Sequence, residues 1–242
     1  GGAEPVSKLR IGTWHLDCAE GNCGRVLQRA VLLSHRADIW VLTETHDDVS
    51  LHPDFQAARS EQQDIQVAPR RLREGSRWVT IWSRYPIREI EVRDRQRTVA
   101  ALVESPEGLI AVFGVVLPWP GSSPGFVPAV EALADEWKAL RSSLPDASLC
   151  VAGDFNADMD TGAGFPGEVA TTTFLKRIRE CGLVCATGPE RTPRGWFATP
   201  PIDHVLVPTK WAGNAEVIDG WHGTLAGDKL SDHGGLIVQV CI

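Results

Sequence analysis

The stretch VAGDFNADMD, residues 151–160, sets polar side chains directly after a short apolar segment. Residues 147–153 predict a buried strand, and Asp154, Phe155 and Asn156 follow it without a gap. Asp, Asn and Gly are frequent turn residues, so one interpretation is a plain turn. The other is a reactive site at a strand end, because binding and catalytic residues concentrate on loops that a rigid scaffold positions.

Similar apolar runs recur along the chain, bounded by Gly, Pro and Asp, which is typical of short strands. The predicted strands cover residues 9–14, 38–45, 77–83, 87–92, 98–104, 109–118, 147–153, 202–207 and 234–242. Apolar residues at helical spacing predict helices over residues 24–35, 126–144 and 167–182. No linker, repeat or low-complexity tract interrupts the sequence. We therefore expect one α/β domain over residues 7–242, with stacked sheets and helices outside.

Composition narrows the function classes. Hydrophobic residues make up 43% of the 242 residues, which is enough for a large core. A net charge of −7 argues against a broad basic surface for nucleic acid, whereas a locally acidic site that binds a cation agrees with it. No apolar run reaches the ~18 residues that a transmembrane helix needs, and no protein partner is indicated.

Cysteine use predicts a cytoplasmic protein. The cysteines include no CxxC pair, and Cys150 and Cys241 lie in apolar runs that are typical of buried free thiols. The start of the sequence lacks the hydrophobic core of a secretory signal. The alternative is a pair of disulfides, Cys18–Cys23 and Cys181–Cys185.

Polar side chains stand at or near the ends of several predicted strands. They are His15 and Asp17, Glu44 and His46, Asp154 and Asn156, Asp203 and His204, and Asp232 and His233. Each alone can be a turn, a cap or a hydrogen-bonding group, although Asp203 stands among apolar residues, where an unpaired carboxylate is costly to bury. Together they predict a site of hard oxygen ligands, which suits Mg²⁺ and a substrate phosphate.

An ordered set of motifs carries a family resemblance. The motifs are TWHLD (13–17), LTETH (42–46), SRYPI (83–87), GDFNAD (153–158), IDHVLV (202–207) and SDHGG (231–235). The set resembles the endonuclease/exonuclease/phosphatase superfamily, which includes pancreatic deoxyribonuclease, apurinic-site endonucleases, sphingomyelinases and inositol-polyphosphate 5-phosphatases. The resemblance implies a four-layer α/β/β/α sandwich of two packed mixed sheets flanked by helices. It also implies divalent-metal-dependent hydrolysis of phosphate esters.

The resemblance assigns three carboxylates to the metal. By position, Glu44 resembles the family's metal-ligand glutamate, and Asp17 resembles an aspartate that some members use for the metal. Asp232 resembles a neighbour that assists the metal. Mg²⁺ is the expected ion.

Four further residues match catalytic positions of the family. Asp154 resembles the group that orients or deprotonates the attacking water, and Asn156 resembles the amide that holds the phosphate or that aspartate. Asp203 resembles the carboxylate that orients a histidine, and His233 resembles that phosphate-binding histidine. The resemblance therefore favours chemistry over a plain turn at residues 151–160.

The sequence departs from the family pattern at two positions. The family usually has Asn where His15 stands, and imidazole suits Mn²⁺ or Zn²⁺ better than Mg²⁺. We expect His15 among the metal ligands, with Mn²⁺ as the alternative ion; a basic group that fills the site, or a tolerated change behind the ligands, stays open. Many members carry His or Tyr at the position of Val116, so a phosphate-contacting or leaving-group-assisting side chain is missing there.

Three residues are expected to bind substrate. Trp119 and Trp196 lie in loops rich in Gly and Pro, and Arg97 ends the basic segment RDRQR (93–97). The first hypothesis is a metal-dependent phosphodiesterase, with nucleic acid as the commonest substrate class of the family. A phosphatase of small molecules or lipid head groups is the second, and an attenuated, non-catalytic binding member of the fold is the third.

Overall fold

The structure is a computed structural model that describes residues 7–18, 25–63, 74–119, 125–161, 164–193, 195–197 and 199–242. Its helices are α1 (Arg25–Ser34), α2 (Phe126–Ser143), α3 (Glu168–Glu180) and the 3₁₀ helix η1 (Thr209–Asn214). Its strands are β1 (Lys8–His15), β2 (Ile39–His46), β3 (Gln56–Arg59), β4 (Ser76–Ser83), β5 (Ile87–Ile90), β6 (Thr98–Ser105), β7 (Gly108–Val116), β8 (Ser148–Asp154), β9 (Leu183–Cys185), β10 (Asp203–Pro208), β11 (Ala215–Trp221), β12 (Thr224–Leu225), β13 (Asp228–Lys229) and β14 (Gly235–Cys241).

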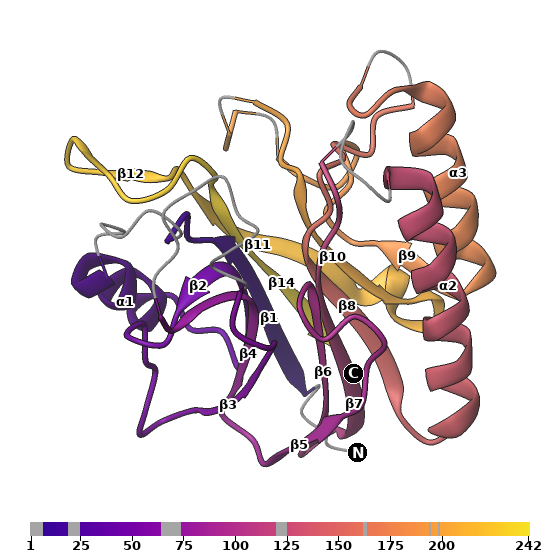
Figure 1. Ribbon diagram of the computed structural model, residues 1–242, viewed down its shortest axis with the longest axis horizontal. Helices are drawn as coiled ribbons and strands as arrows, with labels where there is room; N and C mark the ends of the chain where they lie inside the picture. The colour runs from indigo at the N-terminus through magenta and orange to yellow at the C-terminus, as the bar shows by residue number, and fades with distance from the viewer. Residues whose placement is uncertain are drawn as a thin grey trace, which may run out of the picture.

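Two six-stranded mixed sheets pack face to face. Their strand orders are β11-β14-β1-β2-β4-β3 and β5-β6-β7-β8-β10-β9, and β12 pairs with β13 in a separate hairpin. Helix α1 lies on the outer side of the first sheet, and α2 and α3 lie on the outer side of the second (Figure 1). The arrangement confirms the predicted four-layer α/β/β/α sandwich.

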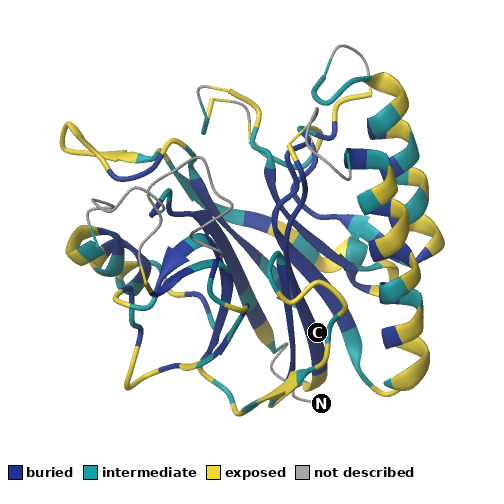
Figure 2. Ribbon diagram, in the orientation of Figure 1, coloured by how far each residue is buried: buried dark blue, intermediate teal, exposed yellow. Residues whose placement is uncertain are grey.

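Alternation along the strands divides the core into layers. In β2, Val41 joins the cluster between the two sheets, whereas Trp40 and Leu42 join the cluster beneath α1. Figure 2 shows the strands buried and the outward faces of the helices exposed. Four tryptophans are fully buried: Trp14, Trp40, Trp82 and Trp137. Because each large ring removes roughly 150–250 Å² from water, packing accounts for much of the unusual Trp content.

The close approach of Trp40 requires glycine on the neighbouring strand. Gly12 of β1 pairs with Trp40 of β2, and a Cβ built on Gly12 would lie 2.3 Å from a Trp40 ring carbon. That separation is far below van der Waals contact. A residue with a side chain would therefore have to move the indole out of its place beneath α1.

Strand register brings the site residues to one end of the sandwich. In the second sheet, Val116 of β7 pairs with Asp154 of β8, and Asp154 pairs with Asp203 of β10. In the first sheet, His15 of β1 pairs with Thr43 of β2. All these pairs lie at the end of the sandwich away from the pairing of β1 and β14 at Lys8 and Cys241.

The predicted strands and helices are all found, with boundaries that differ by a few residues. The predictions missed the short strands β3, β9, β12 and β13, and also β11, whose sequence AEVIDGW mixes charged residues and glycine with apolar ones. Partners in the sheet, rather than local propensity, make these segments strands.

Two further expectations concern cysteines and membranes. Cys181 and Cys185 are free thiols, so the alternative disulfide between them is absent, whereas Cys23 lies outside the described residues. Among the described helices, none combines the length and the apolar content that crossing a bilayer requires. The cytoplasmic location stays a prediction.

Candidate active site

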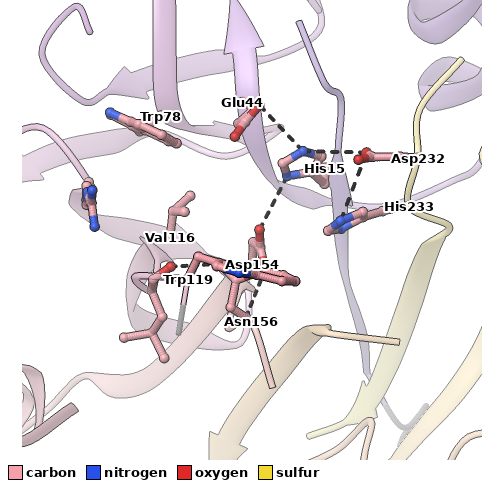
Figure 3. A pocket seen from close by; sticks show the side chains of 11 residues that line it. His15, Glu44, Trp78, Val116, Trp119, Asp154, Asn156, Asp232 and His233 are labelled. Carbon is pink, nitrogen blue, oxygen red and sulfur yellow. Dashed lines mark hydrogen bonds and ion pairs between the residues drawn. The ribbon is translucent and has the colours of Figure 1, made fainter. Parts of the chain in front are cut away.

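A cavity of about 250 Å³ opens at the end of the sandwich where β1, β2 and β8 finish (Figure 3). Its described lining residues are His15, Glu44, Trp78, Arg97, Val116, Leu117, Trp119, Asp154, Asn156, Asp232 and His233. Both sheets contribute to this lining. Of the polar residues singled out in the sequence, this cavity brings together His15, Glu44, Asp154, Asn156, Asp232 and His233.

His15 lies at the centre of the cavity's carboxylates. Its Nε2 lies 3.6 Å from Glu44 Oε2 and 3.7 Å from Asp232 Oδ1, and its Nδ1 lies 3.5 Å from Asp154 Oδ2. The side chain is buried, and its ring is stacked on the ring of His233. The histidine that departs from the family pattern thus contacts three of the acidic groups that the pattern predicts.

The surroundings of His15 favour its protonated form. Burial by itself lowers the pKa of His15, but the hydrogen bond and charge of Asp154, together with Glu44, raise the pKa above 6.5. His233 opposes this rise by like-charge repulsion. A cation that binds the same carboxylates must therefore compete with a proton on His15.

His233 is held by a buried carboxylate. Its Nδ1 lies 2.6 Å from Asp203 Oδ2, and Asp203 is 1% exposed. Burial lowers the pKa of His233, but the charge and hydrogen bond of Asp203 outweigh burial and raise the pKa to about 10. The pairing fixes the proton on Nδ1 and directs the other ring nitrogen, Nε2, toward the cavity side, 4.0 Å from Asp232 Oδ1.

Asp154 and Asn156 form a turn and also line the cavity, so both interpretations of residues 151–160 apply. The Asn156 amide N–H donates to Asp154 Oδ1 at 2.9 Å, which is the local hydrogen bond of an Asx turn. The Asn156 side chain donates to the Leu117 carbonyl at 2.8 Å, and the Leu117 N–H donates to the Asp154 carbonyl. The turn therefore holds the Asp154 carboxylate in place while Oδ2 faces His15.

Backbone strain concentrates at the same residues. Asp17, Glu44 and Asn156 have φ angles of 50°, 40° and 47°, in the left-handed region that non-glycine residues rarely adopt. Each such residue costs of order 1–3 kcal/mol, and the surrounding structure must hold it there. In β2, the strained residue Glu44 lies between Thr43 and Thr45, which both pair with β4, and its side chain reaches the cavity.

Hydrogen bonds join the loop before β14 to the end of β1. The Ser231 hydroxyl donates to the His15 carbonyl at 2.5 Å and accepts the His233 amide N–H at 3.0 Å. The indole N–H of Trp14 donates to the His233 carbonyl at 3.1 Å. Buried Gln28 of α1 donates to both the Leu16 and the Leu230 carbonyls at 2.7 Å. These contacts set the distance between His15 and His233.

Sequence reasoning missed these positioning residues for different reasons. Ser231 stands in the motif SDHGG, so its neighbours were a usable signal. Gln28 lies on the buried face of an amphipathic helix, and a polar residue on that face was a weaker signal. Trp14 carried no signal of its own, because a tryptophan beside a motif is most often a packing residue.

The three residues that were expected to bind substrate do not all lie at the cavity. Arg97 and Trp119 line the cavity, and the Trp119 ring lies against Phe165 with centroids 4.7 Å apart. Trp196 instead packs against Gly220 of β11 and is absent from the described lining of either cavity at this end. The geometry gives Trp196 a packing contact, and its role in substrate binding stays a prediction.

A second cavity of about 510 Å³ adjoins the first and shares Trp119, Asp232 and His233 with it. Its other described lining residues are Asp158, Phe165, Phe197, Thr199, Pro200, Pro201, Ile202, Asp203, His222, Gly223 and Gly234. No lysine or arginine is among them. Its described walls therefore combine aromatic and proline side chains with aspartates and histidines and carry no lysine or arginine.

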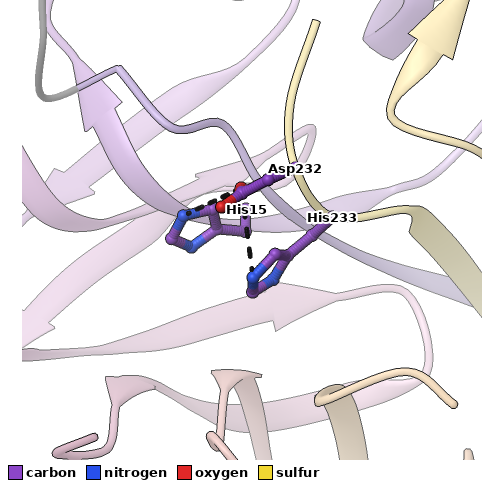
Figure 4. Close-up of side chains that lie close together, drawn as sticks. All are labelled: His15, Asp232 and His233. Carbon is purple, nitrogen blue, oxygen red and sulfur yellow. Dashed lines mark ion pairs between the residues drawn. The ribbon is translucent and has the colours of Figure 1, made fainter. Parts of the chain in front are cut away.

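The ligand atoms suit a shared divalent cation. Nitrogen and oxygen atoms of His15, Asp232 and His233 lie within 4.8 Å of one another (Figure 4). Ligand atoms of His15, Asp17 and Glu44 form a second such group. One cation about 2.1 Å from each ligand atom spans ligands up to roughly 4.2 Å apart, and the 3.6 Å contact of His15 with Glu44 lies within that span, with Asp17 in the same group. Two carboxylates and an imidazole fit Mn²⁺ or Zn²⁺ and accept Mg²⁺.

Known structures share this fold. The chain resembles a Neisseria 3′ phosphatase, NExo, bound to a product DNA hairpin, with 20% identity, a TM-score of 0.64, and coverage of 95% of this chain and 98% of that chain. It resembles an AP endonuclease from Archaeoglobus fulgidus with 16% identity, the same TM-score and the same coverage of each chain. The human Nocturnin catalytic domain matches with 14% identity, a TM-score of 0.65, and coverage of 96% of this chain and 93% of that chain.

Sequence comparison gives the family. A search against curated proteins found no match. Residues 21–233 match the Endonuclease/Exonuclease/phosphatase family, and this range includes most of the cavity residues that the motifs predicted. Since the match extends over most of the 242 residues, the chain belongs to the Endonuclease/Exonuclease/phosphatase family.

Proposed function

We propose that this protein is a divalent-metal-dependent phosphodiesterase that hydrolyses the phosphate backbone of nucleic acid. The observation that carries the proposal is the meeting of a carboxylate cluster around His15 with the Asp203–His233 pair in one cavity. A phosphodiester in this cavity meets a cation site and, next to it, a charged imidazole. Family membership supports phosphoester hydrolysis.

The metal would be held by His15, Asp17 and Glu44, whose ligand atoms lie within 4.8 Å of one another, and Asp232 belongs to a second group with His15 and His233. When bound, a divalent ion neutralises charge on the phosphate and orients the substrate. Glu44 and Asp17 supply the oxygen ligands that Mg²⁺ prefers, whereas the His15 nitrogen favours Mn²⁺. We therefore assign a mixed nitrogen and oxygen site that works with Mg²⁺ and more strongly with Mn²⁺.

Asp154 acts on the attacking water. Its Oδ1 is occupied by the Asn156 amide N–H, which leaves Oδ2 to accept a hydrogen bond from a water in the cavity. A carboxylate in this position orients the water and takes its proton as the new bond to phosphorus forms. Asn156 and Leu117 keep the carboxylate in place through the contacts described above.

His233 acts on the phosphate. Its Nδ1 proton is held by Asp203, so its Nε2 donates to a non-bridging oxygen or to the leaving oxygen of the phosphate. A fixed imidazolium stabilises charge that grows in the transition state without reorganising. Asp203 maintains that charge by raising the His233 pKa.

A second candidate function is hydrolysis of a small-molecule or lipid head-group phosphoester. The adjoining cavity of about 510 Å³ favours it, because aromatic and proline side chains line that cavity and no described lysine or arginine does. A compact apolar group next to the phosphate would fit such walls. A long nucleic-acid backbone would gain little there from charge.

A substrate screen separates these functions. The chain is incubated with supercoiled plasmid, a single-stranded oligonucleotide and p-nitrophenyl phosphate, each with Mg²⁺, Mn²⁺ or EDTA. Strand cleavage that EDTA abolishes supports the first proposal, and release from the monoester with intact DNA supports the second. Turnover of neither substrate would contradict both and leave a non-catalytic binding member of the fold.

Asp154→Asn is the matched inactive variant. The amide keeps an oxygen that can accept the Asn156 N–H and retains nearly the same shape, so the fold should persist. We expect the variant to lose most of the activity while its thermal unfolding temperature stays near that of the wild type. Wild-type rates in this variant would remove Asp154 from the mechanism.

A further inference from the structure

One wall of the cavity carries a cation that the proposed reaction does not use. Arg97 and Trp78 both line the cavity and are half-buried, and the Arg97 guanidinium carbon lies 5.5 Å from the centroid of the Trp78 ring. Arg97 is the only lysine or arginine among the described lining residues. Figure 3 shows Trp78 on the other side of the cavity from Asp232 and His233.

The backbone places Arg97 next to the missing family side chain. The Val116 N–H donates to the Arg97 carbonyl at 3.0 Å, and the next residues, Thr98 and Val115, pair in β6 and β7. Val116 in turn pairs with Asp154 of β8. Arg97 is therefore two strands away from the proposed water-activating carboxylate, and a bulky residue at position 116 would compete with it for space.

Hydrogen bonds fix the chain that leads to Arg97. Asp94 Oδ1 accepts the backbone N–H groups of Gln96 and Arg97 at 3.0 and 3.1 Å, and the Thr98 hydroxyl donates to the Asp94 carbonyl. Trp78 faces Glu44 across β2 and β4, between the pairs Thr43–Val79 and Thr45–Arg77. Hydrogen bonds to Asp94 therefore fix the Arg97 backbone. The Arg97 side chain contacts the Trp78 ring, which belongs to β4 of the first sheet.

Among the residues that the structure describes, the charge of Arg97 has no partner of opposite sign. No described carboxylate forms an ion pair with the Arg97 guanidinium. The guanidinium instead makes a cation–π contact with the Trp78 ring. Taking a charge partly out of water is costly without a counterion. A planar guanidinium binds a phosphate through two parallel hydrogen bonds, so a phosphate is the natural counterion.

We propose that Arg97, positioned by Trp78 and given room by Val116, binds a phosphate that flanks the scissile one. The inference rests on the proposed function and narrows it to substrates with consecutive phosphates, such as an oligonucleotide. The scissile phosphate already has the proposed cation site and His233 on the opposite side of the cavity. Arg97 is then a specificity-determining residue, and Trp78 is a positioning residue.

The test compares substrates that carry one or several phosphates. Arg97→Ala is assayed on bis(p-nitrophenyl) phosphate, which has a single phosphate, and on a single-stranded oligonucleotide. We expect kcat/KM on the oligonucleotide to fall roughly 10- to 100-fold, which is the range for a lost hydrogen bond to a charged group, and to change less than about 2-fold on the single-phosphate ester. Equal losses on both would overturn the assignment to a flanking phosphate, as would no loss on either.

Binding without turnover provides an independent measurement. The affinity for a fluorescent oligonucleotide is followed by anisotropy in EDTA at several salt concentrations. Arg97→Ala should weaken binding and reduce the dependence of log K on log salt by about 0.7, the value for one single-strand phosphate contact. If the wild type hydrolyses no substrate, the proposed function fails. The binding of wild type and Arg97→Ala in EDTA still tests whether Arg97 contacts a phosphate. An unchanged slope would overturn it.

Two variants separate recognition from folding. Arg95→Ala is the matched control, because Arg95 lies in the same basic segment but is exposed and paired with Glu61, and it should change neither affinity nor slope. Trp78→Leu should reduce oligonucleotide affinity and raise KM more than it lowers kcat. Val116→Tyr should shrink the effect of Arg97→Ala in a double-mutant cycle, and an additive result would contradict the shared space.

Discussion

The imidazole rings of His15 and His233 stack with their centroids 4.2 Å apart and their planes 24° from parallel. Two histidines whose pKa values are both raised would repel each other in an ordinary environment. Here Asp203 holds the His233 ring. Asp154, Glu44 and Asp232 surround the His15 ring (Figure 3). The carboxylates around the stacked pair offset this repulsion, and Asp232 lies near both rings. A change to either ring should therefore alter the electrostatics of the other.

Replacing His15 should change the preference for metal ions. His15→Asn substitutes an oxygen ligand for a nitrogen ligand, so we expect Mg²⁺ to raise the thermal unfolding temperature more than in the wild type and Mn²⁺ to raise it less. Mg²⁺-supported activity should rise in parallel. Thermal unfolding with each chloride at equal concentration measures the first effect. An unchanged ranking of the two ions would argue that His15 is not a ligand.

Removing the His233 ring should impair catalysis and spare the fold. His233→Ala deletes the donor that stabilises the transition state, which costs about 10²–10³-fold in kcat for comparable donors. KM should change much less, because the interaction strengthens in the transition state. Steady-state kinetics beside a thermal unfolding curve distinguishes lost chemistry from lost structure. Full activity in this variant would exclude the assigned role.

The Asp203 charge should determine how activity depends on pH. In the wild type, Asp203 raises the His233 pKa to about 10, so the imidazolium persists as the pH rises through neutrality. Asp203→Asn removes that charge, and burial then lowers the pKa, so the imidazolium and the activity should decline above about pH 6–7. A pH–rate profile of both proteins tests this expectation. Superimposable profiles would mean that the pair does not govern the reaction.

Buried His204 should make stability depend on acid. Its Nε2–H donates to the Ala157 carbonyl and its Nδ1 accepts from Thr187, so the ring is neutral, and burial lowers its pKa to about 4. The unfolded chain, with a pKa near 6.5, binds the proton more readily. Stability should therefore fall as the pH decreases from about 6.5 to about 4, by up to ~3 kcal/mol.

The measurement compares His204→Gln with the wild type. Urea unfolding across this pH range should show a shallower loss of stability in the variant, because glutamine can donate to Ala157 and does not titrate. His52→Gln, at an exposed histidine, is the control and should retain the wild-type slope. Equal slopes in all three proteins would locate the acid sensitivity elsewhere.

Gly12 should tolerate no side chain. The added Cβ of Gly12→Ala would lie 2.3 Å from the buried Trp40 ring, and forcing extra volume into a packed core costs about 1–3 kcal/mol. Gly213→Ala is the matched control, because a Cβ there meets nothing within 4 Å. Chemical denaturation of both variants gives the difference. Equal stabilities would show that the indole moves aside at no cost.

Much of the fold followed from local patterns. Apolar runs ending in Asp, Gly or Pro located the long strands, and helical spacing located all three α-helices, because burial imposes these periodicities residue by residue. The short strands, and β11 with its Asp219 and Gly220, carry no such period. β3, β9 and β11 are strands because β4, β10 and β14 offer them hydrogen-bond partners, and β12 and β13 pair with each other.

The sequence predicted many of the residues of the candidate site, but not how these residues contact one another. The motifs named Glu44, Asp154 and His233, since polar residues after buried strands stand out in a single sequence. Trp78 did not stand out, because within β4 it reads as one more apolar strand residue. Trp196 stood out in a loop; the structure places it next to Gly220, a contact that the sequence did not predict.

The sequence by itself determined which chemical groups end the strands and the order in which they follow one another, because strand and turn preferences act over a few neighbouring residues. Only the tertiary structure decided that His15 lies among Glu44, Asp154 and Asp232, and that Arg97 rests on Trp78 beside Val116. These contacts join residues far apart in the chain and on different sheets. Strand register and the packing of one sheet on the other set them, and neither is written in any local stretch of residues.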